Sequence, residues 1–206
     1  MISPKKCFNV LKEHNINFFT GIPDSSLKPF TSYITDNTNK YNNVIAANEG
    51  ACIALALGYY LATNEIPFVY MQNSGLGNAV NPLLSLADKK VYKTPMLLMI
   101  GWRGEPGIKD EPQHIKQGEV TLTMLENMEI PYVILNENEN IAIKQLQTII
   151  ADTKEKSIPH AIVAKRVLFE SYTLQTKISS DYEMSREDAL KIVVDSLEDD
   201  AIAVAT

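Results

Sequence analysis

Residues 44–61 read VIAANEGACIALALGYYL, a short apolar run followed by Asn-Glu-Gly and then by a longer apolar run. The run at residues 44–47 predicts a short strand. The stretch from Ala51 to Leu61 is apolar almost all round, which predicts a helix that is buried between other elements. A strand that passes through a short turn into a buried helix is the repeating unit of an α/β fold.

The same alternation continues on both sides of this segment. Apolar runs predict further strands over residues 17–20, 67–71, 95–100, 131–135 and 159–164. The longer runs are almost continuously apolar, which is typical of parallel strands covered on both faces. Helical patterns lie between them, over residues 3–15, after residue 25, and over 83–88, 118–127 and 140–156. The sequence therefore predicts a doubly wound α/β domain over residues 1–166, a three-layer sandwich around a mainly parallel central sheet.

The composition changes after this domain. Residues 167–183 are polar and show little periodicity, which indicates an inter-domain linker. Beyond it, Ser185 is the predicted cap of an amphipathic helix, and residues 201–206 predict an apolar strand. These two elements cannot bury their apolar faces alone, so we expect residues 184–206 to begin a truncated second domain, although they could instead add an edge strand to the first sheet. We therefore expect the chain to be a fragment, or to be completed by another chain.

Bulk properties narrow the class of protein. The formal net charge is -6 at pH 7, and no segment offers the concentrated positive surface that nucleic-acid binding requires. No run reaches the about 18 apolar residues of a membrane span, and the N-terminus lacks the apolar core of a signal peptide. Cys7 and Cys52 lie in apolar helical patterns that are typical of buried free thiols. We expect a cytoplasmic protein without a nucleic-acid or membrane partner, whereas small anionic substrates remain possible.

Several polar residues follow predicted strands and are candidates for a site, because ligands of open α/β sheets bind at the carboxyl ends of the strands. Glu49 lies at the start of the buried helix, where it could also simply complement the helix dipole while Asn48 caps the helix. Asp24 follows the first strand and is most simply a helix cap.

Two loops add further candidates. Gly75 and Gly77 open the helix that follows the strand ending at residue 71, which is also what a tight turn needs. The loop from residue 101 to about His114 is long, and long loops in compact domains are often functional. It contains Arg103 and Gln113, which would suit an anionic substrate.

Five short motifs in order carry a resemblance that covers nearly the whole chain. They are Gly21-Ile-Pro-Asp-Ser25, Asn48-Glu-Gly50, Gln72-Asn-Ser-Gly-Leu-Gly-Asn78, Gly101-Trp-Arg-Gly104 and Asp110-Glu-Pro-Gln-His114. Together they resemble the motifs of the phosphonopyruvate decarboxylases, and the similar sulfopyruvate decarboxylases share much of the pattern. The resemblance implies that residues 1–166 form a pyrimidine-binding domain for thiamine diphosphate, which a diphosphate-binding domain follows.

The resemblance also implies roles for individual residues. Glu49 matches the acid that hydrogen-bonds N1′ of the aminopyrimidine ring, and Gly75, Gly77 and Asn78 lie on the cofactor side of the same cleft. His114 and Asp24 match positions where related decarboxylases keep proton-transfer groups. The wider superfamily often has paired histidines, whereas this chain has Gln113 before His114, and this departure leaves the division of the proton relay open.

The resemblance predicts the cofactors and the assembly as well. The superfamily holds Mg²⁺ and the diphosphate with a Gly-Asp-Gly motif followed by Asn-Asn, and this sequence has no such motif. We therefore expect no metal site in this chain, and we expect Mg²⁺ and the diphosphate to be held by the missing C-terminal domain. Because the cofactor lies between two subunits in the superfamily, the resemblance implies a homodimer or a higher homo-oligomer.

Three functions remain open at this point. The first is decarboxylation of 3-phosphonopyruvate, a small anionic 2-oxo acid, to phosphonoacetaldehyde and CO2 in phosphonate biosynthesis. The second is the α subunit of a sulfopyruvate decarboxylase, and the third is a flavodoxin-like binding domain without catalysis. Arg103 and Gln113 are substrate-binding candidates under the first two, although a purely structural role for Arg103 fits its position equally well.

Overall fold

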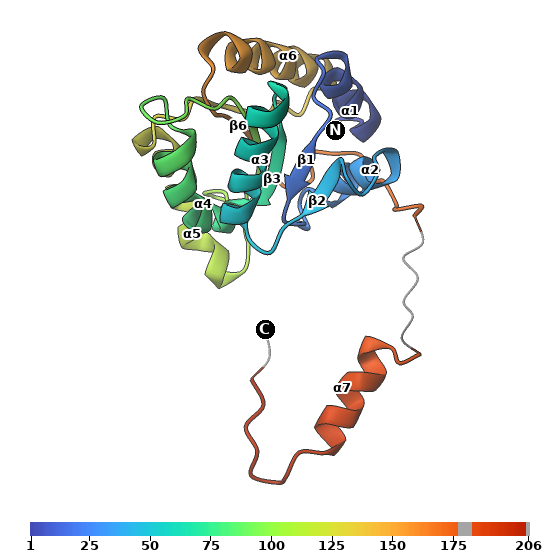
Figure 1. Cartoon of the computed structure of the whole chain (residues 1–206). Helices are drawn as coiled ribbons and strands as arrows, with labels where there is room; N and C mark the ends of the chain where they lie inside the picture. The colour runs from blue at the N-terminus through green and yellow to red at the C-terminus, as the bar shows by residue number, and fades with distance from the viewer. Residues whose placement is uncertain (177–182, 205–206) are drawn as a thin grey trace. The chain divides into compact units, whose positions relative to one another are not determined.

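The computed structural model describes residues 1–176 and 183–204, and a six-stranded parallel sheet forms the centre of residues 1–175 (Figure 1). The strands are β1 (Phe19–Gly21), β2 (Asn43–Ile45), β3 (Phe68–Gln72), β4 (Leu97–Gly101), β5 (Tyr132–Ile134) and β6 (His160–Ala164). Their order is β2-β1-β3-β4-β6-β5, and every neighbouring pair is parallel. The α/β fold with a parallel sheet is therefore confirmed.

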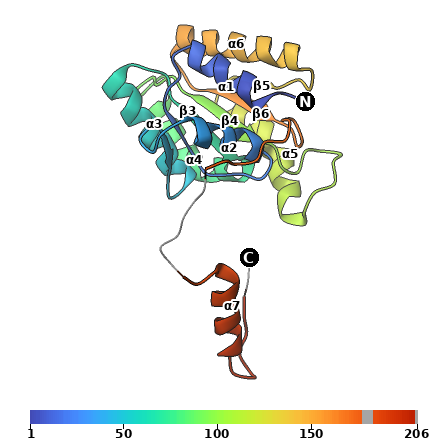
Figure 2. The same cartoon turned by 90° about the vertical axis from the view of Figure 1, so that its right-hand side faces the viewer.

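Helices cover both faces of the sheet (Figure 2). One face packs against α1 (Pro4–Glu13), α2 (Lys28–Asn37) and α6 (Glu139–Lys156). The other face packs against α3 (Glu49–Thr63), α4 (Leu76–Pro82), the π-helical turn η2 (Leu83–Ala87) and α5 (Pro112–Asn127). The result is the three-layer sandwich that the sequence predicts.

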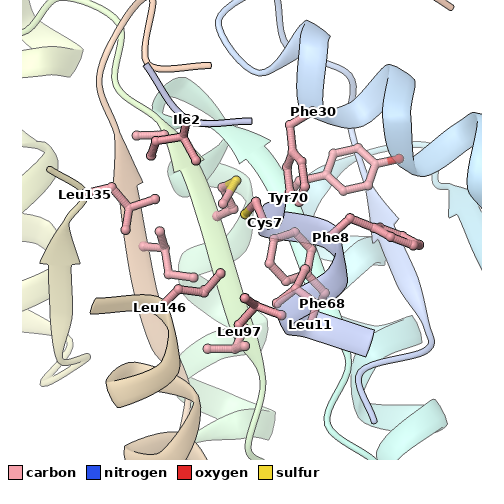
Figure 3. Packing of buried hydrophobic residues seen from close by; sticks show 14 of the residues in the cluster. Ile2, Cys7, Phe8, Leu11, Phe30, Phe68, Tyr70, Leu97, Leu135 and Leu146 are labelled. Carbon is pink, nitrogen blue, oxygen red and sulfur yellow. The ribbon is translucent and has the colours of Figure 1, made fainter. Parts of the chain in front are cut away.

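Alternation along the strands sends side chains into both layers, because successive residues of a strand point to opposite faces. Phe68 and Tyr70 of β3 pack with α1 and α2, whereas Val69 and Met71 pack with α3 and α4. Figure 3 shows the first of these layers, in which Phe68, Tyr70 and Leu97 from the sheet meet Phe8 and Leu11 of α1. Both faces are thus apolar, which explains why the strands are near-continuous apolar runs in the sequence.

Helix α3 differs from its prediction. Cys52, Ile53 and Ala56 are buried against the sheet, but Leu55 and Leu61 on the other side are 40% and 59% exposed. The prediction of a helix buried all round is therefore wrong for one face. An apolar residue pattern indicates a surface that is buried, but it does not indicate whether residues of the same chain or of another molecule bury it.

Two further helices begin earlier than predicted. Helix α5 begins at Pro112 and not at Gly118, so His114 lies in its first turn instead of on a loop. Proline suits the first turn of a helix because its missing N–H has no partner there in any case. The segment predicted as a helix over 83–88 is preceded by a short 3₁₀ turn, η1 (Asn73–Gly75), and by α4, and it continues as η2.

The chain divides into two units, Met1–Gln175 and Thr176–Thr206. The first unit extends past the predicted boundary at residue 166, because Leu168 and Phe169 are buried and Ile2 pairs with Phe169 in a β-bridge. The hydroxyl of Tyr172 also donates a hydrogen bond to Asp36, with a donor–acceptor distance of 2.9 Å. Aromatic anchoring of this kind leaves no periodic signal in a sequence. The remaining linker residues, 177–182, lie outside the described residues.

The second unit contains helix α7 (Arg186–Asp195). Ser185 caps it by accepting a hydrogen bond from the N–H of Asp188, whose carboxylate binds Ser185 in return, so the predicted capping box is confirmed. None of the residues of α7 is buried, and Ile192, Val193 and Val194 are exposed. Residues 201–204 are not a strand, contrary to the prediction, and residues 205–206 lie outside the described residues. A strand needs a partner, and no described residue pairs with this segment.

The burial of His160, the first residue of β6, leads us to expect that the free energy of unfolding depends on pH. It is buried, its Nδ1 lies 3.0 Å from the carbonyl oxygen of Ile158, and its Nε2 has no hydrogen-bond partner among the described residues. Burial lowers the pKa of His160, because desolvation disfavours the charged ring. As the pH falls below about 6.5, the imidazole at position 160 therefore binds a proton in the unfolded chain before it does so in the folded chain. The free energy of unfolding decreases from that pH down to the pKa of the folded state.

We expect the free energy of unfolding to fall less steeply between pH 7.5 and pH 5.5 in His160→Asn than in the unsubstituted chain, as measured by denaturant unfolding. His14→Asn, at an exposed position, is the control for loss of an imidazole. Equal pH slopes for the chain and for His160→Asn would contradict the assignment.

Candidate functional site

Glu49 is the first residue of α3, directly after the loop that leaves β2. Asn48 caps this helix, since its side-chain oxygen accepts a hydrogen bond from the N–H of Ala51 at 2.9 Å. The carboxylate of Glu49 is therefore not needed as a cap. Its Oε2 accepts a hydrogen bond from Asn78 Nδ2 on α4 at 2.8 Å, whereas its Oε1 has no hydrogen-bond partner among the described residues. One oxygen is fixed, and the other is available to a ligand.

Gly75 makes the space in which this carboxylate lies. A Cβ atom at position 75 would be 2.4 Å from Cγ of Glu49 and 2.5 Å from its Cδ and Oε1. Gly50 does the same for α4, since a Cβ there would lie 2.8 Å from the carbonyl oxygen of Asn78. At Gly77, in contrast, a Cβ would meet nothing within 4 Å. Of the two predicted glycines, only Gly75 is required by a close approach within this chain.

Asp24 lies buried after β1. Its Oδ1 accepts a hydrogen bond from Gln72 Nε2 at 2.7 Å, and its Oδ2 accepts hydrogen bonds from the N–H and the hydroxyl of Ser26. The interpretation of Asp24 as a helix cap is wrong, because α2 begins after Leu27 and has no side-chain cap. Gly101 permits this burial, since a Cβ there would lie 2.3 Å from Oδ2 of Asp24. Asp24 is thus held at the carboxyl ends of β1, β3 and β4.

Arg103 follows β4 and forms a two-pronged ion pair with Asp110. Its Nε lies 2.8 Å from Oδ2 of Asp110 and its Nη2 lies 2.5 Å from Oδ1, while its Nη1 donates to the hydroxyl of Ser25 at 3.2 Å. The Arg103 guanidinium holds the pKa of Asp110 well below its usual range, mainly through these hydrogen bonds. Since the Asp110 side chain is only 4% exposed, the pair fixes the orientation of the guanidinium.

His114 and Gln113 lie in the first turn of α5. The Nδ1 atom of His114 is buried without a hydrogen-bond partner among the described residues, and Gln113 is exposed. The loop after β4 lies directly against this turn, because Gly104 has a φ of +68° and a Cβ there would be 1.9 Å from the carbonyl oxygen of His114. His114 is therefore positioned relative to β4 by backbone contact.

The site residues meet at one edge of the sheet, although not all of them touch. The structure brings Glu49, Gly75 and Asn78 into one cluster and Asp24, Ser26 and Gln72 into a second. Gln72 leads from the second cluster toward the first, since its Oε1 accepts a hydrogen bond from the hydroxyl of Ser74 at 2.8 Å. The sequence did not predict the roles of Gln72 and Ser26. Gln72 begins one of the quoted motifs, whereas Ser26 lies just after another and has no signal of its own.

No group of three or more histidine, cysteine or acidic side chains among the described residues could hold a metal ion. Nor does any helix within that part of the chain combine the length and the apolar character of a membrane span.

The sequence is similar to proteins of a known family. Residues 6–128 match the family model described as "Thiamine pyrophosphate enzyme, N-terminal TPP binding domain". The chain is 33% identical over 132 residues to the sulfopyruvate decarboxylase subunit alpha of Methanococcus maripaludis, which covers 64% of this chain and 76% of that protein. It is 38% identical over 122 residues to the phosphonopyruvate decarboxylase of Streptomyces hygroscopicus, which covers 59% of this chain but only 29% of that protein.

Solved structures agree on the fold. The thiamine diphosphate-dependent 4-hydroxybenzoylformate decarboxylase of Rhodococcus jostii RHA1 superimposes with a TM-score of 0.60 at 19% identity, over 94% of this chain and 37% of that chain. The benzoylformate decarboxylase of Polynucleobacter necessarius gives a TM-score of 0.64 at 17% identity, over 89% of this chain and 33% of that chain. The doubly wound sandwich of the pyrimidine-domain type is therefore confirmed.

Proposed function

The chain belongs to the thiamine pyrophosphate enzymes, and we propose that it supplies the aminopyrimidine-binding half of a decarboxylase of the phosphonopyruvate and sulfopyruvate type. The observation that carries the proposal is the carboxylate of Glu49. It is half-buried at the carboxyl edge of the sheet, with Oε2 bound by Asn78 and with Oε1 beside Gly75 and without a hydrogen-bond partner in the described part of the chain. A carboxylate oriented in this way suits a single ring nitrogen as its partner.

The residues present fit the pyrimidine end of thiamine diphosphate. When bound, this cofactor supplies an electron sink for the carbon that loses CO2. Glu49 would hold a proton at N1′ of the ring, and the hydrogen bond from Asn78 would keep its carboxylate in place. Gly75, Gly77 and Asn78 would line the same side of the cleft. Mg²⁺ and the diphosphate would be held by a second domain, because no cluster of metal-ligating side chains occurs in the described residues.

Two further groups would handle protons near the substrate. His114 would be one of them, and its Nδ1 is buried without a hydrogen-bond partner in the part of the chain that the structure describes. Asp24 is already bound by Gln72 and Ser26, and it would act through this hydrogen-bonded network.

The reaction breaks the bond between the carboxyl carbon and the keto carbon, releases CO2 and adds one proton to the former keto carbon. An aldehyde results.

We assign 3-phosphonopyruvate as the substrate, with phosphonoacetaldehyde as the product. The identity of 38% to the Streptomyces hygroscopicus enzyme supports this choice. Sulfopyruvate is the second candidate, because the chain is 33% identical to an α subunit of a sulfopyruvate decarboxylase and covers 76% of it. Both substrates are 2-oxo acids with a tetrahedral anionic group on the neighbouring carbon.

Partners would complete the site. Residues 184–206 would begin a diphosphate-binding domain, and the exposed apolar side chains of α7 support this, since a helix with no buried residue needs a covering surface. Leu55 and Leu61 on α3 likewise form an exposed apolar face beside the site, which we assign to contact with a second copy of the chain. We propose a homodimer or a higher homo-oligomer.

The test is an assay of the complete enzyme for CO2 release from phosphonopyruvate, sulfopyruvate and pyruvate, with and without added thiamine diphosphate. We expect activity that depends on the cofactor, with kcat/KM highest for phosphonopyruvate and lowest for pyruvate. Highest kcat/KM for sulfopyruvate would move the assignment to the second candidate. Cofactor-independent activity, or no CO2 release from any of the three, would contradict the proposed function.

A further inference from the structure

A depression at the carboxyl edge of the sheet is lined by residues other than those of the Glu49 cluster. Loops after three strands form it, and its lining includes Ser25 and Ser26 after β1, Arg103 after β4, and Arg166 and Val167 after β6. Its volume is about 630 Å³, within the range of roughly 300–1,000 Å³ that is usual for small-molecule sites. No aspartate or glutamate is among its lining residues. The depression therefore favours a negatively charged ligand.

The two guanidinium groups that line the depression differ in how many hydrogen-bond and ion-pair partners they already have. Arg103 is bound by Asp110 and Ser25, so that three of its nitrogens have partners. Arg166 is exposed and forms no hydrogen bond or ion pair with any residue that the structure describes. The nearby Lys165 is neutralised by Glu105 at 2.7 Å. The ammonium group of Met1, which also lines the depression, donates a hydrogen bond to the carbonyl oxygen of Glu137. Arg166 is thus the guanidinium of this depression that has no partner among the described residues.

A hydroxyl group adds a donor beside these cations. Ser25 accepts the hydrogen bond from Nη1 of Arg103, which leaves its own proton free to be donated to a ligand. The hydroxyl of Ser26, in contrast, already donates to Asp24. Ser25 and Arg166 therefore both offer hydrogen-bond donors to an anion in this depression.

The backbone at Arg166 is held in an unusual conformation. Val167 has a φ of +63° and is 70% exposed, although β-branched residues strongly disfavour this left-handed region. Such strain persists only where the surroundings enforce it, and it is frequent at ligand-binding positions. Here Ala164 on one side and Leu168 on the other are both buried, and Ile2 donates a hydrogen bond to the carbonyl of Leu168 at 2.9 Å. The tight turn that carries Arg166 is therefore fixed by the core on both sides.

We propose that Arg166, with Ser25, binds the tetrahedral phosphonate or sulfonate group of the substrate. This inference rests on the proposed function. The carboxylate of the substrate is the poorer candidate for this cation, because it leaves as neutral CO2, and an ion pair with it would stabilise the substrate more than the transition state. The phosphonate or sulfonate keeps its charge throughout, so binding it costs nothing in the chemical step. Arg103, fixed by Asp110, then orients Ser25 and does not act as the main anion ligand.

The test is Arg166→Gln in the complete enzyme, with Lys154→Gln on α6 as the control for loss of an exposed positive charge. We expect kcat/KM for phosphonopyruvate or sulfopyruvate to fall by about 10- to 50-fold, mainly through KM, as for loss of one charged hydrogen bond. We expect less than about a threefold change for pyruvate, which has no tetrahedral anion. Arg166→Lys should recover part of the loss. Equal losses for all three substrates, or no loss, would overturn the proposal.

Two further measurements separate this proposal from its alternatives. The concentration of thiamine diphosphate that gives half-maximal activity should be unchanged in Arg166→Gln, whereas an increase would assign Arg166 to the cofactor diphosphate and overturn the proposal. Binding of methylphosphonate and methanesulfonate by calorimetry needs no turnover, so it is informative even if the decarboxylase assignment fails. We expect Arg166→Gln to weaken that binding by at least about tenfold. Unchanged binding would overturn the anion site alone.

Discussion

Glu49→Gln in the complete enzyme is expected to lower kcat for CO2 release by about 10³-fold, in the range that general acid–base groups contribute. The amide has the length and shape of the carboxylate and can still accept the hydrogen bond from Asn78. It cannot, however, exchange a proton with a ring nitrogen at the position of Oε1. The loss should therefore fall on kcat, while folding is preserved because neither oxygen of Glu49 caps α3. Steady-state assays with saturating substrate and cofactor measure this effect.

Glu155→Gln is the matched control for this substitution, because Glu155 lies exposed on α6. It should leave kcat within about a factor of two, as expected for a surface position. Denaturant midpoints of both variants should equal that of the unsubstituted enzyme. If Glu49→Gln folds normally and retains full turnover, the thiamine assignment fails, and a non-catalytic binding domain becomes the better description.

Much of the fold follows from the sequence because its signals are local. Apolar runs of about five residues between helical patterns predict every strand of the first unit, since strands covered on both faces have no polar side. Helix starts are equally local where a side chain caps them, as at Asn48 and Ser185. The start of α5 at Pro112 and the docking of Phe169 depend on contacts between distant segments, so the sequence could not predict them.

The candidate site divides in the same way. Its position at the carboxyl ends of the strands follows from topology, and the motifs single out Glu49, Asp24 and His114. The hydrogen-bond and ion-pair partners of each side chain do not follow from the topology or from the motifs. The ion pair between Asp110 and the Arg103 guanidinium depends on the conformation of a loop. The lack of a counter-ion for Arg166 among the described residues depends on which acidic side chains lie near it in space. Nothing in the sequence around residue 166 indicates a ligand.

A second large effect is expected at Gly75, where Gly75→Ala should lower kcat/KM by about 10²-fold without unfolding the protein, as expected when a catalytic group is displaced by about 1 Å. The backbone at this position has φ −72° and ψ −15°, which alanine adopts without strain. The added methyl group would nevertheless lie 2.4–2.5 Å from Cγ, Cδ and Oε1 of Glu49. Because the contact is with a flexible side chain, the carboxylate will move and the helix will stay.

Gly77→Ala provides the comparison, because it makes the same chemical change two residues further along in α4. A Cβ at position 77 would meet no atom of the described residues within 4 Å, so none of their side chains has to move. The substitution should raise the free energy of unfolding by about 0.4–1 kcal/mol, since alanine is the better helix former. If Gly77→Ala also loses activity, position 77 lies against something outside this chain, such as the cofactor that the family resemblance assigns to it. If Gly75→Ala keeps full activity, the exact position of the Glu49 carboxylate is not what the reaction requires.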